Sequence, residues 1–247
     1  SPILQTEIIK IKSMAIEYNK DYIHHSNPGS ASMIREIVFG MEDGMVSTLG
    51  SVTGIAAATQ DPFTTVLAGL VIISVESISM GVGSYLSNKS EREIDERKIF
   101  EEKEEIKNHP EEEREELRDM YLKDGWPKDL AERMADVARD NPAIMLKEMS
   151  FRELEVIPEG MGSPIRNGFA MLISYIIGGA IPLTPYLMLP VEKAIPLSIR
   201  ITLIGLFTLG VVTARFTKRS WWKAGLEMLA LASGAAAIGY FVGQAVD

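Results

Sequence analysis

The chain has 247 residues, no cysteine and only three histidines, which excludes disulfides, cysteine-type zinc sites and a histidine-rich metal site. Its net charge of −9 arises in one block, because residues 89–160 carry 23 acidic and 14 basic side chains whereas the rest of the chain is neutral. An acidic block of this kind argues against nucleic acid as a partner and favours cations.

Residues 3–25 predict an amphipathic helix within an amino-terminal part that comprises residues 1–32. Apolar side chains at Leu4, Ile8, Ile11 and Ala15 recur in steps of three and four, which places them on one helix face. Such a helix either packs on its own protein or lies on a membrane surface. The segment "HHSNPGS" then ends it.

Five apolar segments further along the chain are long enough to cross a bilayer. About 20 helical residues span the hydrocarbon core, and each segment meets or nearly meets that length. The segments are Met33–Thr59, Thr64–Ser87, Ile165–Ile181, Ala194–Phe216 and Ala224–Val246. The chain is therefore predicted to be an all-α polytopic membrane protein with five transmembrane helices, two in residues 33–88 and three in residues 161–247.

The basic residues of the connecting loops predict the orientation, because Lys and Arg are enriched on the cytoplasmic side of a membrane. They gather after the second segment and between the fourth and the fifth. The loop "TQDP" has none, and the loop between the third and fourth segments has only Lys193. The amino terminus and the acidic block are therefore predicted to lie in the cytosol.

Residues 89–160 are predicted to form a cytosolic helical bundle that is inserted after the second span. No proline or glycine interrupts the chain between Ser84 and Asn108, so the second span can leave the membrane as one continuous helix. Pro110 and Pro142 each suit the first turn of a further helix, and "KDLAERMADVARD" forms another between them.

Glutamates at three-residue spacing predict a metal site in this bundle. Side chains three apart share a helix face, and two such pairs on antiparallel helices can point into one space, which a Met and a Glu of the last helix would close. Carboxylates with a thioether suit a divalent transition metal of borderline softness, whereas oxygen alone suits Mg²⁺ or Ca²⁺. The alternative is a solvated acidic helix face. The candidate ligands are Glu102, Glu105, Glu113, Glu116, Met149 and Glu153.

Acidic residues also interrupt the first two spans. Glu42 and Asp43 lie in "FGMEDGMVSTLGSVTG", and Glu76 and Met80 lie four apart in "VIISVESISMGVGSY". A carboxylate at the centre of a span costs about 2.5–3.5 kcal/mol on insertion scales, so such residues usually serve a transport path. Glycines four apart let helices approach closely, which brings these acids together between spans one and two or across a dimer axis. The alternatives are a salt bridge with Arg35 or Arg200, or a permanently protonated acid.

With these residues in view, the chain resembles the vacuolar iron transporter family. The resemblance extends from about Ser32 to the carboxyl end and rests on "EDGMVSTLG", "ISMGVGSYLSNKSE", the acidic insert and "YIIGGAIPLTPYL". It implies a homodimer of five-span protomers that moves Fe²⁺, and often Mn²⁺ or other divalent metals, out of the cytosol in exchange for protons. It also implies that Asp43 and Met80 lie on the translocation path and that the six insert residues named above bind metal.

Two positions depart from the family pattern. Ser150 stands where some members carry a second methionine, and Ile72 stands where they place an acid in the second span. Glu76 lies one helical turn after Ile72 and can do the same work from the same face. The metal preference and the proton coupling are therefore less firmly predicted than the fold.

The sequence thus predicts a proton-coupled exporter of Fe²⁺ and other divalent metals, not an enzyme, with no prosthetic group. The path is predicted to comprise Asp43, Glu76 and Met80, together with Glu42 and Glu36. The expected partners are divalent metal ions, protons, lipid and a second copy of the chain, with no nucleic acid or nucleotide. A prokaryotic cell membrane is slightly favoured over a vacuolar one.

Two other functions fit parts of the pattern. A membrane-anchored ferritin-like di-iron oxidase also uses glutamate pairs on antiparallel helices, but such sites normally include Glu-x-x-His, and His109 lies in a predicted turn. A non-transporting metal sensor would bind the ion in the insert and carry no flux. The glycines of "GVGSYL" lie within a span and not after a strand, so they do not predict a nucleotide site.

Overall fold

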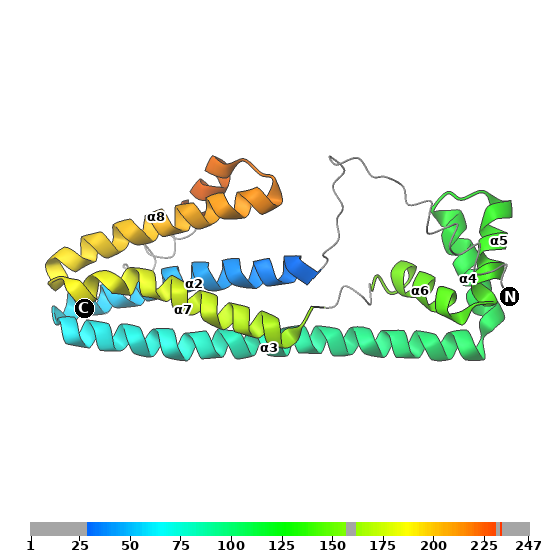
Figure 1. Ribbon diagram of the computed structural model, residues 1–247, viewed down its shortest axis with the longest axis horizontal. Helices are drawn as coiled ribbons and strands as arrows, with labels where there is room; N and C mark the ends of the chain where they lie inside the picture. The colour runs from blue at the N-terminus through cyan, green and yellow to red at the C-terminus, as the bar shows by residue number, and fades with distance from the viewer. Residues whose placement is uncertain (1–28, 157–161, 231–232, 234–247) are drawn as a thin grey trace, which may run out of the picture.

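The computed structural model describes residues 29–156, 162–230 and 233, and all regular secondary structure in them is helical (Figure 1). The predicted amino-terminal helix and most of the predicted fifth span lie outside these residues, although residues 221–230 form the start of a helix. The helices are α2 (Gly29–Thr59), α3 (Pro62–Asn108), α4 (Pro110–Lys123), α5 (Lys128–Arg139), α6 (Pro142–Arg152), α7 (Pro164–Met188) and α8 (Val191–Thr217).

The first part of α3 lies side by side with α2 and α7, and α8 packs on α2 and α7 (Figure 1). Within the described residues, α3, α7 and α8 are long and apolar enough to cross a membrane. The 31-residue α2 is also long enough, but Glu42, Asp43 and its small polar residues lower its mean hydropathy. The chain is therefore an all-α membrane protein.

Helix α3 is continuous over 47 residues, about 70 Å, which confirms the prediction that the second span extends beyond the membrane segment as one helix. Asp61 caps its start by accepting a bond from the Thr64 backbone nitrogen at 2.8 Å. The helix ends at Asn108 because Pro110 begins α4. The first part of α3 packs on α2 and α7, and its end packs on α4 and α6. Between these two parts, residues 89–101 carry three exposed acid–base pairs at four-residue spacing, which stabilise a helix that lacks other contacts.

The end of α3 packs with α4, α5 and α6 around a separate apolar core, and these four elements are called the bundle below (Figure 1). Both predicted proline starts are observed, at Pro110 and Pro142, and the Asn141 side chain caps α6. The core residues are Ile106, Leu117, Tyr121, Ala131, Ala138, Met145 and Met149.

The sequence predicts a close helix approach between the first and second spans or across a dimer axis. Within the described chain the closest approach is between α2 and α7 instead of α2 and α3, and the dimer alternative stays a prediction. A Cβ atom added at Gly44 would lie 2.4 Å from the Tyr175 carbonyl oxygen, and one added at Gly178 would lie 2.4 Å from the Met41 carbonyl oxygen. Glycine is therefore required for backbone contact between these two helices. In contrast, a Cβ atom at Gly50 or Gly54 would meet nothing within 4 Å in the described chain.

Helices α2 and α3 run antiparallel in a defined register. Near one end of the pair, Ser84 Oγ donates to Glu36 Oε2 at 2.8 Å. Near the other end, a Cβ atom added at Gly69 would lie 3.1 Å from the Val52 side chain. Because both contacts belong to one register, position 43 of α2 lies opposite positions 77–78 of α3, in the same helical turn as Glu76.

Candidate functional site

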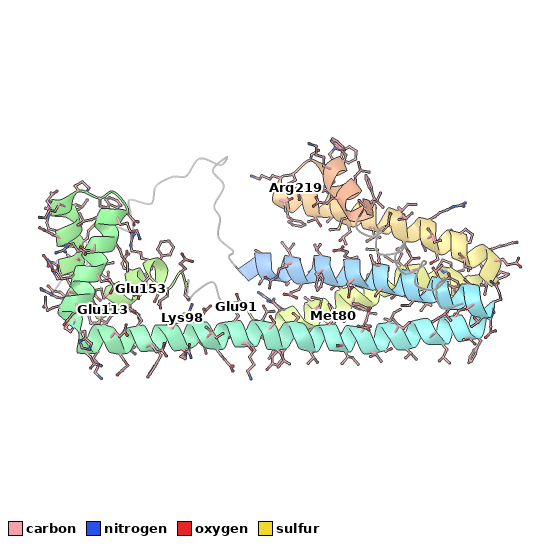
Figure 2. All side chains as sticks on the ribbon, turned by 180° about the vertical axis from the view of Figure 1, so that it is seen from behind. Met80, Glu91, Lys98, Glu113, Glu153 and Arg219 are labelled. Atoms are coloured by element: carbon pink, nitrogen blue, oxygen red, sulfur yellow. The ribbon has the colours of Figure 1, made fainter. Side chains whose placement is uncertain are left out.

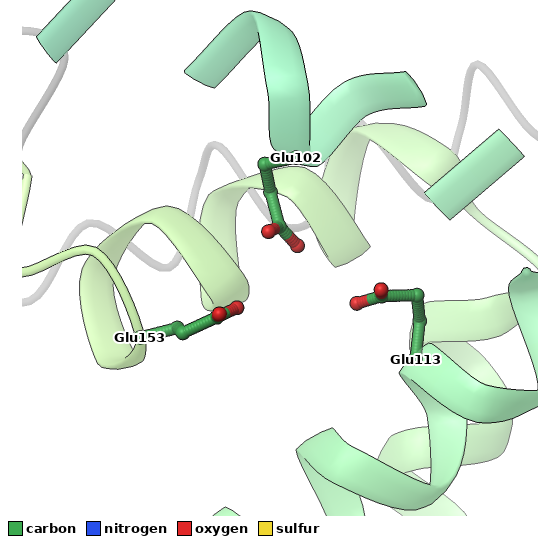
Figure 3. A group of neighbouring side chains, drawn as sticks. All are labelled: Glu102, Glu113 and Glu153. Carbon is green, nitrogen blue, oxygen red and sulfur yellow. The ribbon is translucent and has the colours of Figure 1, made fainter. Parts of the chain in front are cut away.

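Three glutamates of the bundle point their carboxylates into one space (Figure 3). They are Glu102 of α3, Glu113 of α4 and Glu153 at the end of α6. One carboxylate oxygen of each lies within 4.8 Å of those of the other two. Oxygens that bind the same ion at about 2.0–2.6 Å are about 3–5 Å apart, so this spacing fits a single cation.

The local structure explains why these three side chains meet. Glu102 lies one turn before the core residue Ile106 on α3, and Glu113 lies one turn before the core residue Leu117 on α4. Helix packing around the core therefore turns both carboxylates inward. Glu153 follows α6, where its backbone nitrogen donates to the Met149 carbonyl at 2.8 Å.

The cluster holds more negative charge than its surroundings neutralise. Glu102 is 2% and Glu113 is 6% exposed, and one oxygen of each is buried without a hydrogen-bond partner in the part of the chain that the structure describes. Burial raises the pKa of Glu102 to about 8, and the charges of Glu153 and Glu113 add to that shift. Such orphaned oxygens gain a partner when a proton or a cation enters.

The other two predicted glutamates lie at the edge of the cluster. Glu105 and Glu116 are exposed. After burial, the charge of Glu116 is the largest cause that raises the pKa of Glu113 and of Glu153, and Glu105 contributes to both shifts. These two carboxylates thus face the same space as the three central ones without joining the group of close oxygens.

The bundle arginines do not neutralise the cluster, because surface acids already engage them. Arg114 binds Asp136 at 2.6 Å, and Arg152 binds Glu148 at 3.0 Å and also pairs with Asp124. The Arg152 guanidinium lies over the Tyr121 ring, 4.6 Å from its centroid. These contacts fix the end of α6, and with it the position of the following glutamate.

Met149 and Ser150 are both fully buried. Met149 packs in the apolar core of the bundle, so the structure gives it a packing role, and coordination through its sulfur stays a prediction. The Ser150 hydroxyl is buried without a partner among the described residues. The structure offers no reason for that hydroxyl.

The acids of the membrane helices form a second group, about 40 Å from Glu102 along α3. The register of α2 and α3 sets half-buried Asp43 opposite the turn that carries Glu76, and each carboxylate lies within range of the other's charge. Arg35 pairs with Glu36 at 3.1 Å. In the described part of the chain, neither Asp43 nor Glu76 forms an ion pair with a basic side chain.

Met80 lies on α3 beside the other membrane helices, far from Glu113 and Glu153 at the opposite end of the molecule (Figure 2). It is partly buried and lies one turn after Glu76 on the same helix face. Glu42 is half-buried, but it points about 100° away from its neighbour Asp43. Asp43 and Glu76 lie within range of each other's charge, and the grouping of Met80 with them stays a prediction.

Sequence reasoning missed several polar side chains around these acids. Tyr175 of α7 is fully buried, and its hydroxyl lies 2.6 Å from Ser47 Oγ, one turn after Asp43 on α2. Ser84 and Asn88 on α3 continue the four-residue spacing that begins at Glu76 and Met80. That spacing of polar residues in an apolar helix was the available signal.

Comparison with known proteins identifies the family. The chain is 28% identical to vacuolar iron transporter 1 of Arabidopsis thaliana, an alignment that covers 99% of this chain and 100% of that protein. It is 28% identical to vacuolar iron transporter 1 of Oryza sativa subsp. japonica over 91% of both chains. It is 27% identical to the vacuolar iron transporter of Plasmodium falciparum, over 79% of this chain and 76% of that one. The VIT family model matches residues 34–244, and the chain belongs to the VIT family.

Proposed function

We propose that this membrane protein exports Fe²⁺, and also Mn²⁺ and related divalent metals, from the cytosol in exchange for protons. Membership of a transporter family whose relatives are named for iron supports metal-ion transport. The observation that carries the proposal is the pair Asp43 and Glu76, two acids on adjacent membrane helices that lie within range of each other's charge and have no ion-pair partner in the described chain. A cation and protons can neutralise such a pair in turn.

In this proposal the bundle captures ions and the membrane helices move them. Glu102, Glu113 and Glu153 bind the cation, with Glu105, Glu116 and Met149 around them. Their raised carboxyl pKa values support exchange of a bound proton for a metal ion. Asp43, Glu76 and Met80 bind the ion in the membrane, and Glu36 and Glu42 border the path.

In this proposal the topology has five spans, of which α2 is the first and the predicted segment Ala224–Val246 is the fifth. The proposed division of the chain is an amino-terminal part (1–32), the first two spans (33–88), the metal-binding bundle (89–160) and the last three spans (161–247). The distribution of basic loop residues supports an amino terminus and a bundle in the cytosol. The relatives' names refer to a vacuole, and the preference for a prokaryotic cell membrane stays a prediction from the sequence.

A homodimer with the path near its axis accounts for the position of Glu76. This side chain is exposed in the single chain, among exposed Val75 and Ile78. A charged group that faces lipid is costly, so a second copy is the better neighbour. Gly50 and Gly54, beside which no described residue lies within 4 Å of an added Cβ atom, support a further close helix contact there.

Flux into proteoliposomes tests the proposal. With Mn²⁺ outside and an imposed pH gradient, Asp43→Asn is expected to lower flux at least tenfold, because it removes the charge from the path. Asp61→Asn is the matched control, because Asn keeps the helix cap outside the path. Asp43→Asn protein that still moves Mn²⁺ in response to the pH gradient would overturn the assignment. Wild-type protein that binds Mn²⁺ without flux would favour the sensor.

The structure does not favour the di-iron oxidase. The close group of possible ligands in the described residues consists of three glutamates without histidine. Ferritin-like sites normally add a Glu-x-x-His motif. Fe²⁺-dependent oxygen consumption by the purified protein would restore this alternative.

A further inference from the structure

A buried polar network joins α2, α3 and α7 at the end of the membrane helices that faces the bundle. Ser84 Oγ donates to Glu36 Oε2 at 2.8 Å, and Asn88 Nδ2 lies 3.4 Å from Glu36 Oε1. Asn167 Nδ2 of α7 donates to Asn88 Oδ1 at 2.7 Å. Glu36 is 5% exposed and Asn167 is fully buried. We call these four residues the polar joint.

The neighbours of Asn88 fix the direction of its amide. Its Nδ2 donates to the Ser84 backbone oxygen at 2.8 Å and lies 3.4 Å from Ser84 Oγ. A reversed amide would set its oxygen against this carbonyl and against the Glu36 carboxylate, acceptor against acceptor. The donor from Asn167 satisfies the oxygen in the observed direction. Asn167 therefore acts with the Ser84 carbonyl to hold Asn88 with its donor towards Glu36.

The side chain of Asn167 leaves one of its own polar atoms without a partner while it makes this bond. Its own Oδ1 is buried without a hydrogen-bond partner among the described residues. A buried amide oxygen without a partner destabilises a fold, and an apolar side chain of the same size would avoid that loss. The hydrogen bond to Asn88 is thus the reason for an asparagine, and not an apolar residue, at position 167.

The polar joint lies at one end of the acidic path. Glu36 precedes Asp43 by seven residues, two turns of α2, so the two carboxylates share a helix face about 10 Å apart along the axis. On α3, Ser84 lies one turn after Met80 on the face that meets α2. An ion that travels from the bundle to Asp43 along this face meets Glu36 first.

We propose that Asn88 and Asn167 are positioning residues that hold the Glu36 carboxylate in a fixed orientation, as the first acceptor for divalent cations arriving from the bundle. This inference rests on the proposed transport function. Ser84 and Arg35 supply further donors to the same carboxylate. Asn167 touches no ion itself and acts through Asn88.

The test measures initial Mn²⁺ flux against Mn²⁺ concentration in proteoliposomes with a fixed pH gradient. Asn167→Asp keeps the side-chain size but removes the donor when ionised. We expect KM to rise about tenfold, the loss typical of one hydrogen bond to a charged group, with the maximal rate within about twofold. Ser198→Ala is the control, because it removes another buried hydroxyl bond between membrane helices and should leave KM unchanged.

A double variant separates positioning from folding. In Asn167→Asp the Asn88 oxygen loses its donor, while Glu36→Gln removes the charge that the ion would meet. The double variant should have the same KM as Glu36→Gln alone, because a positioning residue acts only through the Glu36 carboxylate. If Asn167→Asp does not fold, Asn167→Leu, which also lacks the donor, should show the same rise in KM.

Two results would overturn this inference. One is an unchanged KM in the Asn167 variants, and the other is a double variant whose KM clearly exceeds that of Glu36→Gln alone. Both differ from failure of the proposed function, in which the wild-type protein itself carries no flux.

Discussion

The bundle and the membrane helices both bury glutamate, but they balance its charge differently. In the bundle, Glu102 and Glu113 face other carboxylates, and each keeps a buried oxygen without a partner in the described chain. In the membrane helices, Glu36 receives bonds from the side chains of Ser84 and Arg35. A carboxylate without donors is ready to bind a cation, whereas a carboxylate among donors is held in place. The donors around Glu36 thus orient an acceptor on the proposed path, whereas the bundle carboxylates keep oxygens without any partner in the described chain.

One continuous helix connects the two regions and also keeps them apart. Glu76 and Glu102 lie on the same α3, about 40 Å from each other, with an exposed stretch between them that carries Glu91 and Lys98 (Figure 2). A single ion therefore cannot contact both regions at once. Substitutions in the bundle should change the affinity for the metal ion, and substitutions in the membrane helices should change folding or the rate of transport.

The largest expected effect is on the packing of the membrane helices. Gly44→Ala places a methyl group 2.4 Å from the Tyr175 carbonyl oxygen, and backbone atoms cannot move aside as a side chain can. We expect a loss of about 3 kcal/mol in the free energy of unfolding, measured for the purified protein in detergent. Gly83→Ala is the control, because its methyl group on exposed α3 meets nothing within 4 Å in the described chain. Equal stability of the two variants would contradict the α2–α7 contact.

In the bundle, Glu102→Gln should weaken Mn²⁺ binding about 10- to 100-fold without stopping flux at saturating metal. The reason is that Gln keeps the shape but removes one of three converging charges. Titration calorimetry on the full chain checks the affinity. Glu112→Gln is the matched control, since Glu112 precedes Glu113 on α4 and is exposed. An equal loss in both variants would mean that net charge alone attracts the ion.

The stability of the metal-free protein should depend on pH through Glu102 in the bundle. The pKa of Glu102 is about 8 in the folded chain, above its ordinary value of 4.5, so folding favours the protonated form. This contribution to stability is complete below about pH 4.5 and is lost as the pH rises through about 8. Between about pH 7 and 8 the metal-free protein should lose about 1 kcal/mol. Thermal unfolding at several pH values measures the slope of stability against pH, and bound Mn²⁺ should reduce that slope.

Glu102→Gln serves as the control for that slope, because it removes the titrating group. A slope that persists in this variant would assign the pH dependence to other residues.

The smallest effect concerns Met149. Met149→Leu conserves volume in the bundle core, so the free energy of unfolding should change by less than about 1.5 kcal/mol. If the sulfur also binds the ion, Fe²⁺ affinity should fall a few-fold while Mn²⁺ affinity stays constant, because a thioether prefers the softer metal. Unchanged affinity for both metals would restrict Met149 to packing.

Local sequence signals determined most of the helices. Proline at the start of α4 and α6, and the absence of proline and glycine before Asn108, predicted helix limits that the structure confirms. These signals act within one or two turns, where backbone sterics decide the outcome. The sequence also named the bundle glutamates as candidates, because three-residue spacing places side chains on one face.

Only the tertiary structure decided which helices and side chains meet. It brings Glu153 to Glu102 and Glu113 while it leaves Glu105 and Glu116 at the edge, and it packs Gly44 against α7 instead of α3. Helical spacing gives the face on which a residue lies, but it does not give the neighbour of that face. The neighbour depends on packing between helices that are distant in sequence, and Asn167, isolated in an apolar segment, acquires its role only through such contact.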